Sequence, residues 1–90
     1  MATRHKSAVK RHRQNLKRQT RNVAIRTRVR HILRTTREAI ANKSVENAEA
    51  QLRDAVKTLT KAVSKGVLHR NSASRRISHL SKQVAALKAS

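Results

Sequence analysis

The chain has 90 residues and carries 23 Lys or Arg against four Asp or Glu, which gives it a formal net charge of +19. A chain this short makes one small domain at most. Because Phe, Tyr, Trp and Cys are all absent, the core must be aliphatic, without a disulfide or a thiolate metal site. So large a charge predicts a polyanionic partner, with nucleic acid favoured and a membrane surface second. No apolar run approaches the roughly 20 residues of a membrane-spanning helix, and we expect no signal peptide.

The stretch from Arg4 to Arg37 dominates the first half of the chain. Its 34 residues include thirteen Lys or Arg, and they contain no Asp, Glu, Gly or Pro. Because nothing in this stretch breaks a helix, it predicts one long helix of about 50 Å, at 1.5 Å per residue.

Residues 1–21 are the least apolar part of the N-terminal half. After Met1, their only large apolar side chains are Val9 and Leu16, which are too few for a face that packs on a core. The composition fits both a disordered basic arm and a helix that forms only on a partner. We expect residues 4–21 to be largely disordered in the free protein. A mitochondrial transit peptide would explain residues 1–20 but not the basic residues that follow.

A core-facing stripe begins at Ile25. One threonine and several apolar residues recur there at helical spacing on one face: Ile25, Val29, Ile32, Leu33, Thr36 and Ile40. At 100° per residue, the opposite face holds four residues that we expect to meet the partner: Thr27, Arg30, His31 and Arg34. We expect this helix to end near Ala41, with Asn42 in a left-handed conformation.

A second helix is predicted over residues 45–65. Ser44 is a good N-cap for this helix, and Glu46 and Glu49 would lie near its positive end. Its apolar residues again share one face: Val45, Ala48, Leu52, Ala55, Val56, Leu59 and Val63.

This second helix is nearly balanced in charge. Residues 41–65 sum to +2, against +12 for residues 1–40, so we interpret the helix as scaffold rather than as a binding surface. Acidic and basic residues lie three or four positions apart along it. We therefore expect two exposed ion pairs: Glu49 with Arg53, and Asp54 with Lys57.

A third helix follows the only glycine, Gly66, which stands where a left-handed residue is needed after the second helix. Asn71 is placed to cap this third helix. Its core-facing residues are Ala73, Ile77, Leu80, Val84 and Leu87. Arg75 and Lys82 project away from that stripe, and Arg76 lies on its flank.

Three amphipathic helices with short connections predict an all-α fold, a three-helix antiparallel bundle with a long, overhanging basic N-terminal helix. We expect one helical domain over residues 1–90. It divides into a protruding basic arm, residues 1–21, and the bundle, residues 22–90. The sequence contains no evident internal repeat and no sign of a second domain.

Catalysis and metal binding find little support. The five histidines, at positions 5, 12, 31, 69 and 79, include no pair at i,i+4 and have no cysteine beside them, so they do not indicate zinc. Pairing with basic residues explains most of the four carboxylates better than acid–base chemistry does. We therefore expect no enzyme, no metal or other cofactor and no small-molecule substrate.

The absence of aromatic residues also bears on the kind of nucleic acid. Sequence-tolerant single-strand binders generally stack bases on aromatic side chains. A long basic helix instead suits phosphates and the shape of folded, largely double-stranded nucleic acid. These arguments leave RNA and DNA equally open, so a nucleoid-type DNA-compacting protein is the alternative. A membrane-active cationic helix is disfavoured because residues 4–21 are polar on all sides.

Two local patterns resemble a known family. Residues 65–76, KGVLHRNSASRR, resemble the K-G-hydrophobic-hydrophobic-H-K/R-N-x-A-x-R signature of the bacterial small-subunit ribosomal protein S-twenty. Residues 6–11, KSAVKR, resemble that family's K-S-A-x-K-R opening. The long first helix of the family has similar residues at the positions of Asn22, Arg26, Arg30, Ile32 and Leu33. The first turn departs from the family, which often has Gly-Asp where this chain has Lys43-Ser44.

The resemblance implies a three-helix bundle that binds 16S ribosomal RNA directly and early in assembly of the small ribosomal subunit. We interpret the protein as a structural constituent that neutralises phosphates and bridges RNA segments. It would be ribosome-bound in the cytoplasm, with few protein contacts and no homo-oligomer.

Carried over by position, the resemblance implies an N-terminal arm inserted among RNA helices and a second contact surface around the start of the third helix. Helix capping alone would also explain Asn71, and His69 could instead pack against the turn. We expect Arg30 and Arg34 to supply charge, and Arg75 and Arg76 to supply selectivity. The full set of predicted RNA-binding residues is Lys6, Lys10, Arg11, Arg13, Lys17, Arg18, Arg21, Arg26, Arg30, Arg34, His69, Arg70, Asn71, Arg75 and Arg76.

Overall fold

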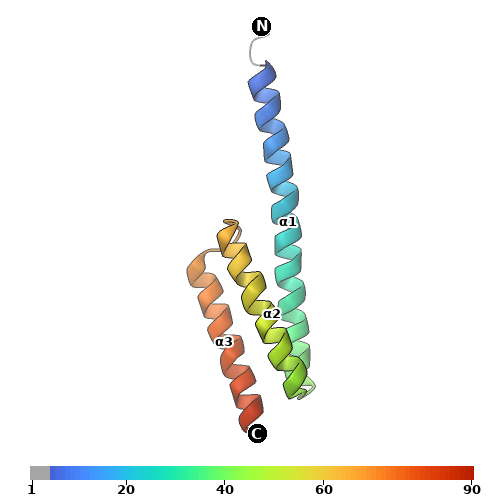
Figure 1. Ribbon diagram of the computed structural model, residues 1–90, viewed down its shortest axis with the longest axis vertical. Helices are drawn as coiled ribbons and strands as arrows, with labels where there is room; N and C mark the ends of the chain where they lie inside the picture. The colour runs from blue at the N-terminus through green and yellow to red at the C-terminus, as the bar shows by residue number, and fades with distance from the viewer. Residues whose placement is uncertain (1–4) are drawn as a thin grey trace.

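The computed structural model describes the backbone of residues 5–90 and the side chains of residues 8–90. This part of the chain forms three helices: α1, His5–Ala41; α2, Val45–Ser64; and α3, Arg70–Ala89. The connections are short, so each helix runs antiparallel to the one before it (Figure 1). The prediction of an all-α three-helix bundle is confirmed. The side chain of Lys6, a predicted site residue, lies outside the described residues.

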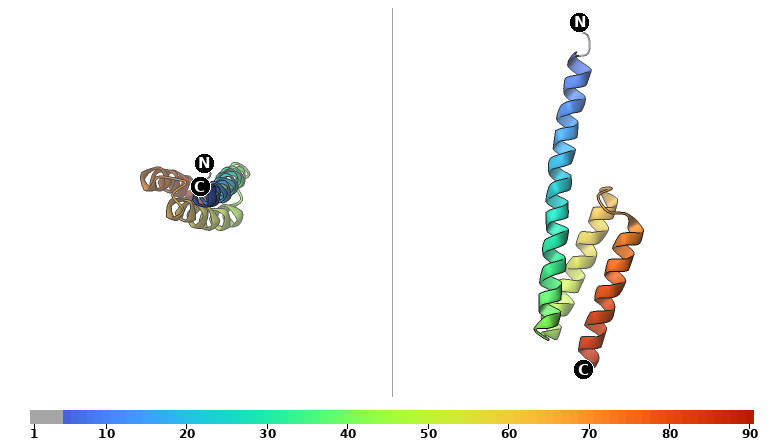
Figure 2. Two further views of the ribbon diagram at one scale, coloured as in Figure 1. Left: turned by 90° about the horizontal axis from the view of Figure 1, so that it is seen from above. Right: turned by 180° about the vertical axis from the view of Figure 1, so that it is seen from behind.

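The central helix is α2. It packs against both neighbours, whereas α1 and α3 touch each other far less, and Figure 2 shows α1 and α3 flanking α2 when the molecule is viewed end on. Since α1 has 37 residues against 20 in each of the other two helices, its N-terminal half extends beyond the bundle (Figure 1). The molecule is therefore elongated, with extents of 70 × 21 × 13 Å, and the predicted overhang is confirmed.

The main core cluster draws on all three helices: Val29, Leu33, Ala55, Leu59, Ala62, Ala73 and Leu80. Leu59 and Leu80 are at most 1% exposed. Three fully buried alanines, Ala48, Ala55 and Ala62, recur along α2 at a spacing of seven residues. Small side chains at a contact let helix axes approach closely, so this row allows α2 to pack against both neighbours. The predicted stripes are confirmed, and Ala62 is a core position that the prediction omitted.

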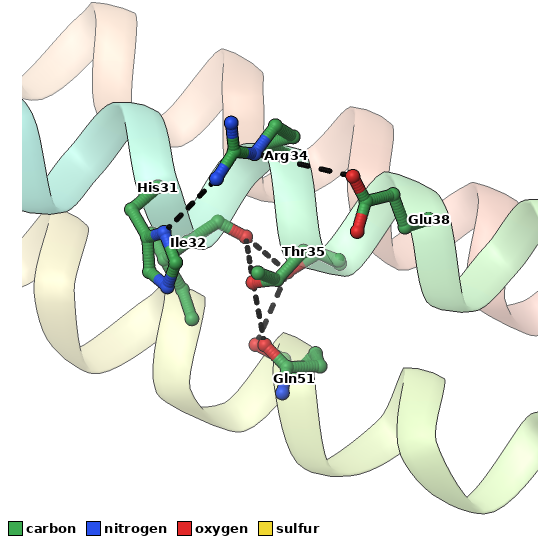
Figure 3. Close-up of polar contacts among 7 residues, drawn as sticks. His31, Ile32, Arg34, Thr35, Glu38 and Gln51 are labelled. Atoms are coloured by element: carbon green, nitrogen blue, oxygen red, sulfur yellow. Dashed lines mark hydrogen bonds and ion pairs between the residues drawn. The ribbon is translucent and has the colours of Figure 1, made fainter.

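Polar contacts also join α1 to α2. Thr36 is fully buried, and its hydroxyl donates to the Ile32 carbonyl at 2.6 Å. Beside it, the Thr35 hydroxyl donates to Oε1 of Gln51 on α2 at 2.8 Å (Figure 3). A buried hydroxyl without a partner costs stability. These bonds therefore satisfy the polar groups within the interface and favour one alignment of α1 along α2.

The first turn differs from the prediction by one residue. The helix α1 ends at Ala41, as predicted, but the left-handed residue is Lys43, with φ of 57°, and not Asn42. The amide of Asn42 still donates to the Glu38 carbonyl at 2.9 Å, so helical hydrogen bonding continues through Asn42 and the chain reverses afterwards. Ser44 occupies the predicted N-cap position with an extended backbone, although its side chain makes no capping hydrogen bond.

The second turn confirms the role of Gly66 and moves the cap of α3. Gly66 has a left-handed φ of 74°, as predicted. The helix α3 begins at Arg70, and its N-cap is His69, whose Nδ1 accepts a hydrogen bond from the Asn71 amide at 3.1 Å. The prediction of Asn71 as the cap is wrong, because the imidazole nitrogen of His69 supplies the acceptor two residues earlier.

The ion pairs predicted along α2 are absent from the described side chains. Glu49 instead pairs with Lys88 of α3, with 2.9 Å between Oε1 and Nζ. The other pair among residues 8–90 joins Arg34 to Glu38 on α1 at 3.9 Å. The packing of α3 beside α2 brings a lysine within reach of Glu49, so tertiary structure overrides the local spacing that motivated the prediction.

Candidate nucleic-acid interface

The projecting half of α1 forms an exposed arm. Every side chain from position 8 to position 21 is exposed. Even the apolar side chains of Val9 and Leu16 are each 48% exposed. Six predicted site residues lie here: Lys10, Arg11, Arg13, Lys17, Arg18 and Arg21. At 100° per residue they fall within an arc of roughly 160° around the helix. The arm therefore has one basic side.

A second basic surface lies between α1 and α3. Arg30, Arg34 and Arg37 line one hollow together with Arg76, and Arg75 shares an adjoining hollow with Arg37 and Arg76. The α1/α3 face is defined here by six residues: Arg30, Arg34, Arg37, Arg75, Arg76 and His79. The structure thus brings together two arginine pairs that the sequence analysis treated as separate surfaces. Arg37 and His79 were not predicted, although each lies three positions after a predicted arginine.

The charge of the α1/α3 face is almost entirely positive. Glu38 is the one carboxylate that lines its two hollows. Its oxygen lies 3.9 Å from Nε of Arg34, whose Nη2 is 3.5 Å from Nδ1 of His31 (Figure 3). The side chains of Arg34 and Glu38 are 69% and 64% exposed, so water screens their attraction and the guanidinium remains accessible to an anion.

The start of α3 carries the remaining cluster of predicted residues. His69, Arg70 and Asn71 are exposed at the end of the bundle from which the arm projects (Figure 1). The cap that His69 forms gives it a structural role, and Asn71 contributes its amide to that cap. Arg26 is exposed on α1, outside the residues that line the α1/α3 face.

A third hollow lies between α1 and α2. Arg21 and Arg28 line it from α1, Lys57 and Lys61 line it from α2, and Lys65 lines it from the C-cap of α2. Of these five cations the sequence analysis predicted only Arg21 as a site residue, because the balanced charge of the second helix indicated scaffold. The spacing of four residues between the lysines was the available signal, since it places them along one side of a helix.

Among residues 5–90, no group of three or more His, Cys, Asp or Glu is arranged to hold a metal ion. Within the same range, no helix is both long enough and apolar enough to cross a membrane. The chemistry that the described side chains do offer is the binding of anions by exposed guanidinium and ammonium groups.

The chain matches known proteins over most of its length. Residues 3–85 match the family described as ribosomal protein S20. A protein of Oleidesulfovibrio alaskensis, named small ribosomal subunit protein bS20, is 48% identical over 80 residues, which cover 89% of this chain and 92% of the relative. A protein of the same name from Syntrophobacter fumaroxidans is 48% identical over 83 residues, or 92% of this chain and 96% of the relative.

A third relative of that name, from Helicobacter pylori strain Shi470, is 48% identical over 80 residues, or 89% of this chain and 90% of the relative. The matched region includes both local patterns, residues 6–11 and 65–76. The members of the ribosomal protein S20 family are structural constituents of the ribosome, so the prediction that this chain is not an enzyme is confirmed. The chain belongs to the ribosomal protein S20 family.

Proposed function

We propose that the protein binds 16S ribosomal RNA directly within the small ribosomal subunit, neutralises RNA phosphates and bridges RNA segments during assembly. The observation that carries this proposal is the gathering of exposed cations into separate surfaces, the arm and the α1/α3 face, on one folded scaffold. The names of the relatives support the small subunit as its place. The protein is then ribosome-bound in the cytoplasm, with few protein contacts and no homo-oligomer.

The separation of the two surfaces supports a bridging role. Lys10 on the arm and Arg34 on the α1/α3 face belong to the same helix, and they are roughly 36 Å apart at 1.5 Å per residue. Charges interact weakly beyond a Debye length of about 8 Å at physiological salt. The arm and the face therefore bind phosphates independently, and once the arm is bound to RNA the continuous helix α1 fixes the distance between the RNA segments that they hold.

The alternative of a DNA-compacting protein is tested by competition. Affinity for folded 16S ribosomal RNA is measured against mixed-sequence duplex DNA at one salt concentration, because basic proteins bind any polyanion more tightly at low salt. We expect a clear preference for the folded RNA. Equal affinity for the two nucleic acids would contradict the proposal and favour the DNA-compacting function.

The α1/α3 face is tested with two double variants, Arg30→Gln with Arg34→Gln, and Arg75→Gln with Arg76→Gln. Each should reduce the magnitude of the slope of log affinity against log salt by roughly 1 to 2, since about one counterion stays on the RNA for each phosphate contact that is lost. Because the two pairs line adjoining hollows, we expect both variants to lose selectivity for the ribosomal RNA alike.

A matched control removes two lysines outside both surfaces, Lys43→Gln with Lys82→Gln, which are exposed. Its salt slope should match that of the parent protein. If only the Arg75 and Arg76 variant loses selectivity against an unrelated structured RNA, the two arginine pairs have different roles, as expected from the sequence. Arg30 and Arg34 then supply charge, and Arg75 and Arg76 supply selectivity.

A further inference from the structure

The hollow between α1 and α2 has no role in the function proposed above. Its volume is about 440 Å³, and five of its eight lining residues are cations, with no carboxylate among the other three. All five cations, Arg21, Arg28, Lys57, Lys61 and Lys65, are exposed. None of them forms an ion pair with another described side chain. A cluster of like charges without internal counterions favours an external anion.

The shape of this cluster favours a chain of phosphates over a single anion. Arg21 and Arg28 are seven residues apart on α1, which is about 10 Å. Lys57 on α2 and Lys65 at its C-cap are eight residues apart, which is about 12 Å. The two helices run antiparallel, so the cations form two facing rows of similar length. Thr58 and the apolar side chains of Ala24 and Ile25 complete the lining, and the apolar part suits contact with the sugar edge of a strand.

The basic side of the arm continues into this hollow. Lys10, Lys17, Arg21 and Arg28 follow one another at spacings of seven, four and seven residues, so they fall within about 40° of one another around α1. Arg30, on the α1/α3 face, lies roughly 160° away from Arg28 around the same helix. Arg28 therefore lies on the same side of α1 as the cations of the arm, Arg30 lies on the other side, and the hollow opens away from the α1/α3 face.

We propose that the α1/α2 hollow is an additional RNA-backbone site, which receives the strand that follows the basic side of the arm. It holds a segment of ribosomal RNA different from the one on the α1/α3 face. This inference rests on the proposed function, since it takes ribosomal RNA as the polyanion. Lysine ammonium groups bind phosphates as point charges, and contacts to phosphates carry no information on base sequence, so the site positions RNA without selecting it. The helix α2 is then part of the interface as well as of the scaffold.

The test compares two variants of the full chain that lose equal charge. Lys57→Gln with Lys61→Gln removes two cations from the hollow, and Lys43→Gln with Lys82→Gln removes two exposed lysines elsewhere. For folded 16S ribosomal RNA, the first variant should reduce the magnitude of the slope of log affinity against log salt by roughly 1 to 2. The second variant should leave this slope unchanged. Thermal melts should show both variants folded, because all four side chains are exposed.

A second measurement uses the unaltered protein. Acetylation of lysines, followed by mass spectrometry, should find Lys57, Lys61 and Lys65 protected in the RNA complex while Lys43 and Lys82 stay reactive. If the parent protein prefers folded ribosomal RNA to DNA, yet the two variants have equal slopes and the three lysines remain reactive, the hollow is not a binding site and the proposed function stands. If the parent shows no such preference, the proposed function itself fails.

Discussion

The two halves of α1 carry similar charge but are stabilised by different means. Residues 8–21 contain six Lys or Arg, and residues 22–41 contain five. The second half buries Val29, Leu33 and Thr36 against its neighbours, whereas the arm has no comparable contact. An isolated helix of about 12 to 15 residues is marginal in water, and like charges four residues apart weaken it further. Charge therefore determines what α1 binds, and the apolar stripe determines where it is anchored.

The largest difference between the arm and the bundle should appear in the rates of amide hydrogen exchange of the free protein. Amides of residues 8–20 have no tertiary contact to protect them, so we expect exchange close to the rate of an unfolded chain. Core amides such as that of Leu59 should exchange only on global unfolding, and hence on the order of 10³-fold or more slowly. Backbone NMR at physiological salt measures both. Strong protection and stable helical shifts across the arm would contradict the expectation that it is largely disordered without RNA.

The fold was predictable because the sequence contains few competing signals. Apolar residues recur at helical spacing in three blocks, and short connections leave antiparallel packing as the simple solution. The turns were less predictable, since one residue decides each of them. Asn42 and Lys43 were both adjacent to the turn, and His69 and Asn71 both carry an acceptor for a helix cap. Local sequence does not decide between such neighbours, because the packing of the following helix does.

Core truncation gives the next largest effect. Leu59→Ala and Leu80→Ala should each destabilise the bundle by about 2 to 5 kcal/mol, because both side chains are at most 1% exposed and leave a cavity. Leu16→Ala in the arm, where the side chain is 48% exposed, should change the unfolding free energy by less than about 0.5 kcal/mol. Denaturant unfolding of the three variants gives the comparison. A core variant as stable as the parent would mean that the helix faces do not meet as described.

The candidate sites were only partly predictable for a related reason. Net charge over a segment identified the arm, the face opposite the apolar stripe identified Arg30 and Arg34, and the family resemblance identified Arg75 and Arg76. Net charge, however, averages over a whole segment. Lys57, Lys61 and Lys65 were overlooked because the three acidic residues elsewhere along residues 41–65 cancel their charge in the sum. Once α2 packs beside α1, those lysines lie next to Arg21 and Arg28. Which cations gather is a property of helix pairing, and composition does not contain it.

Backbone changes should produce a smaller difference in stability between the bundle and the arm. Gly66→Ala should destabilise the bundle by about 1 to 2 kcal/mol, because an L-residue is strained at φ of 74°. No atom lies within 4 Å of the added Cβ, so the cost arises from the backbone alone, and Gly66→Asn should cost less. In the arm, Gln19→Gly should weaken the local helix by about 1 kcal/mol without moving the thermal midpoint of the bundle. Equal midpoints for Gly66→Ala and the parent would show that the left-handed turn is not required.

The smallest expected effect concerns single charges, and its sign differs between the bundle and the arm. Lys88 lies 2.9 Å from Glu49, but the two side chains are 56% and 35% exposed. Solvent screening therefore limits the cost of Lys88→Gln to about 0.2 to 1 kcal/mol, and high salt should abolish it. Lys17 instead has Arg13 and Arg21 four residues away on either side, so Lys17→Gln relieves repulsion and should raise the helical content of the arm. Thermal melts at low and high salt measure the first variant, and circular dichroism at low temperature measures the second. If Lys17→Gln lowers the helical content, repulsion between cations is not what limits the arm.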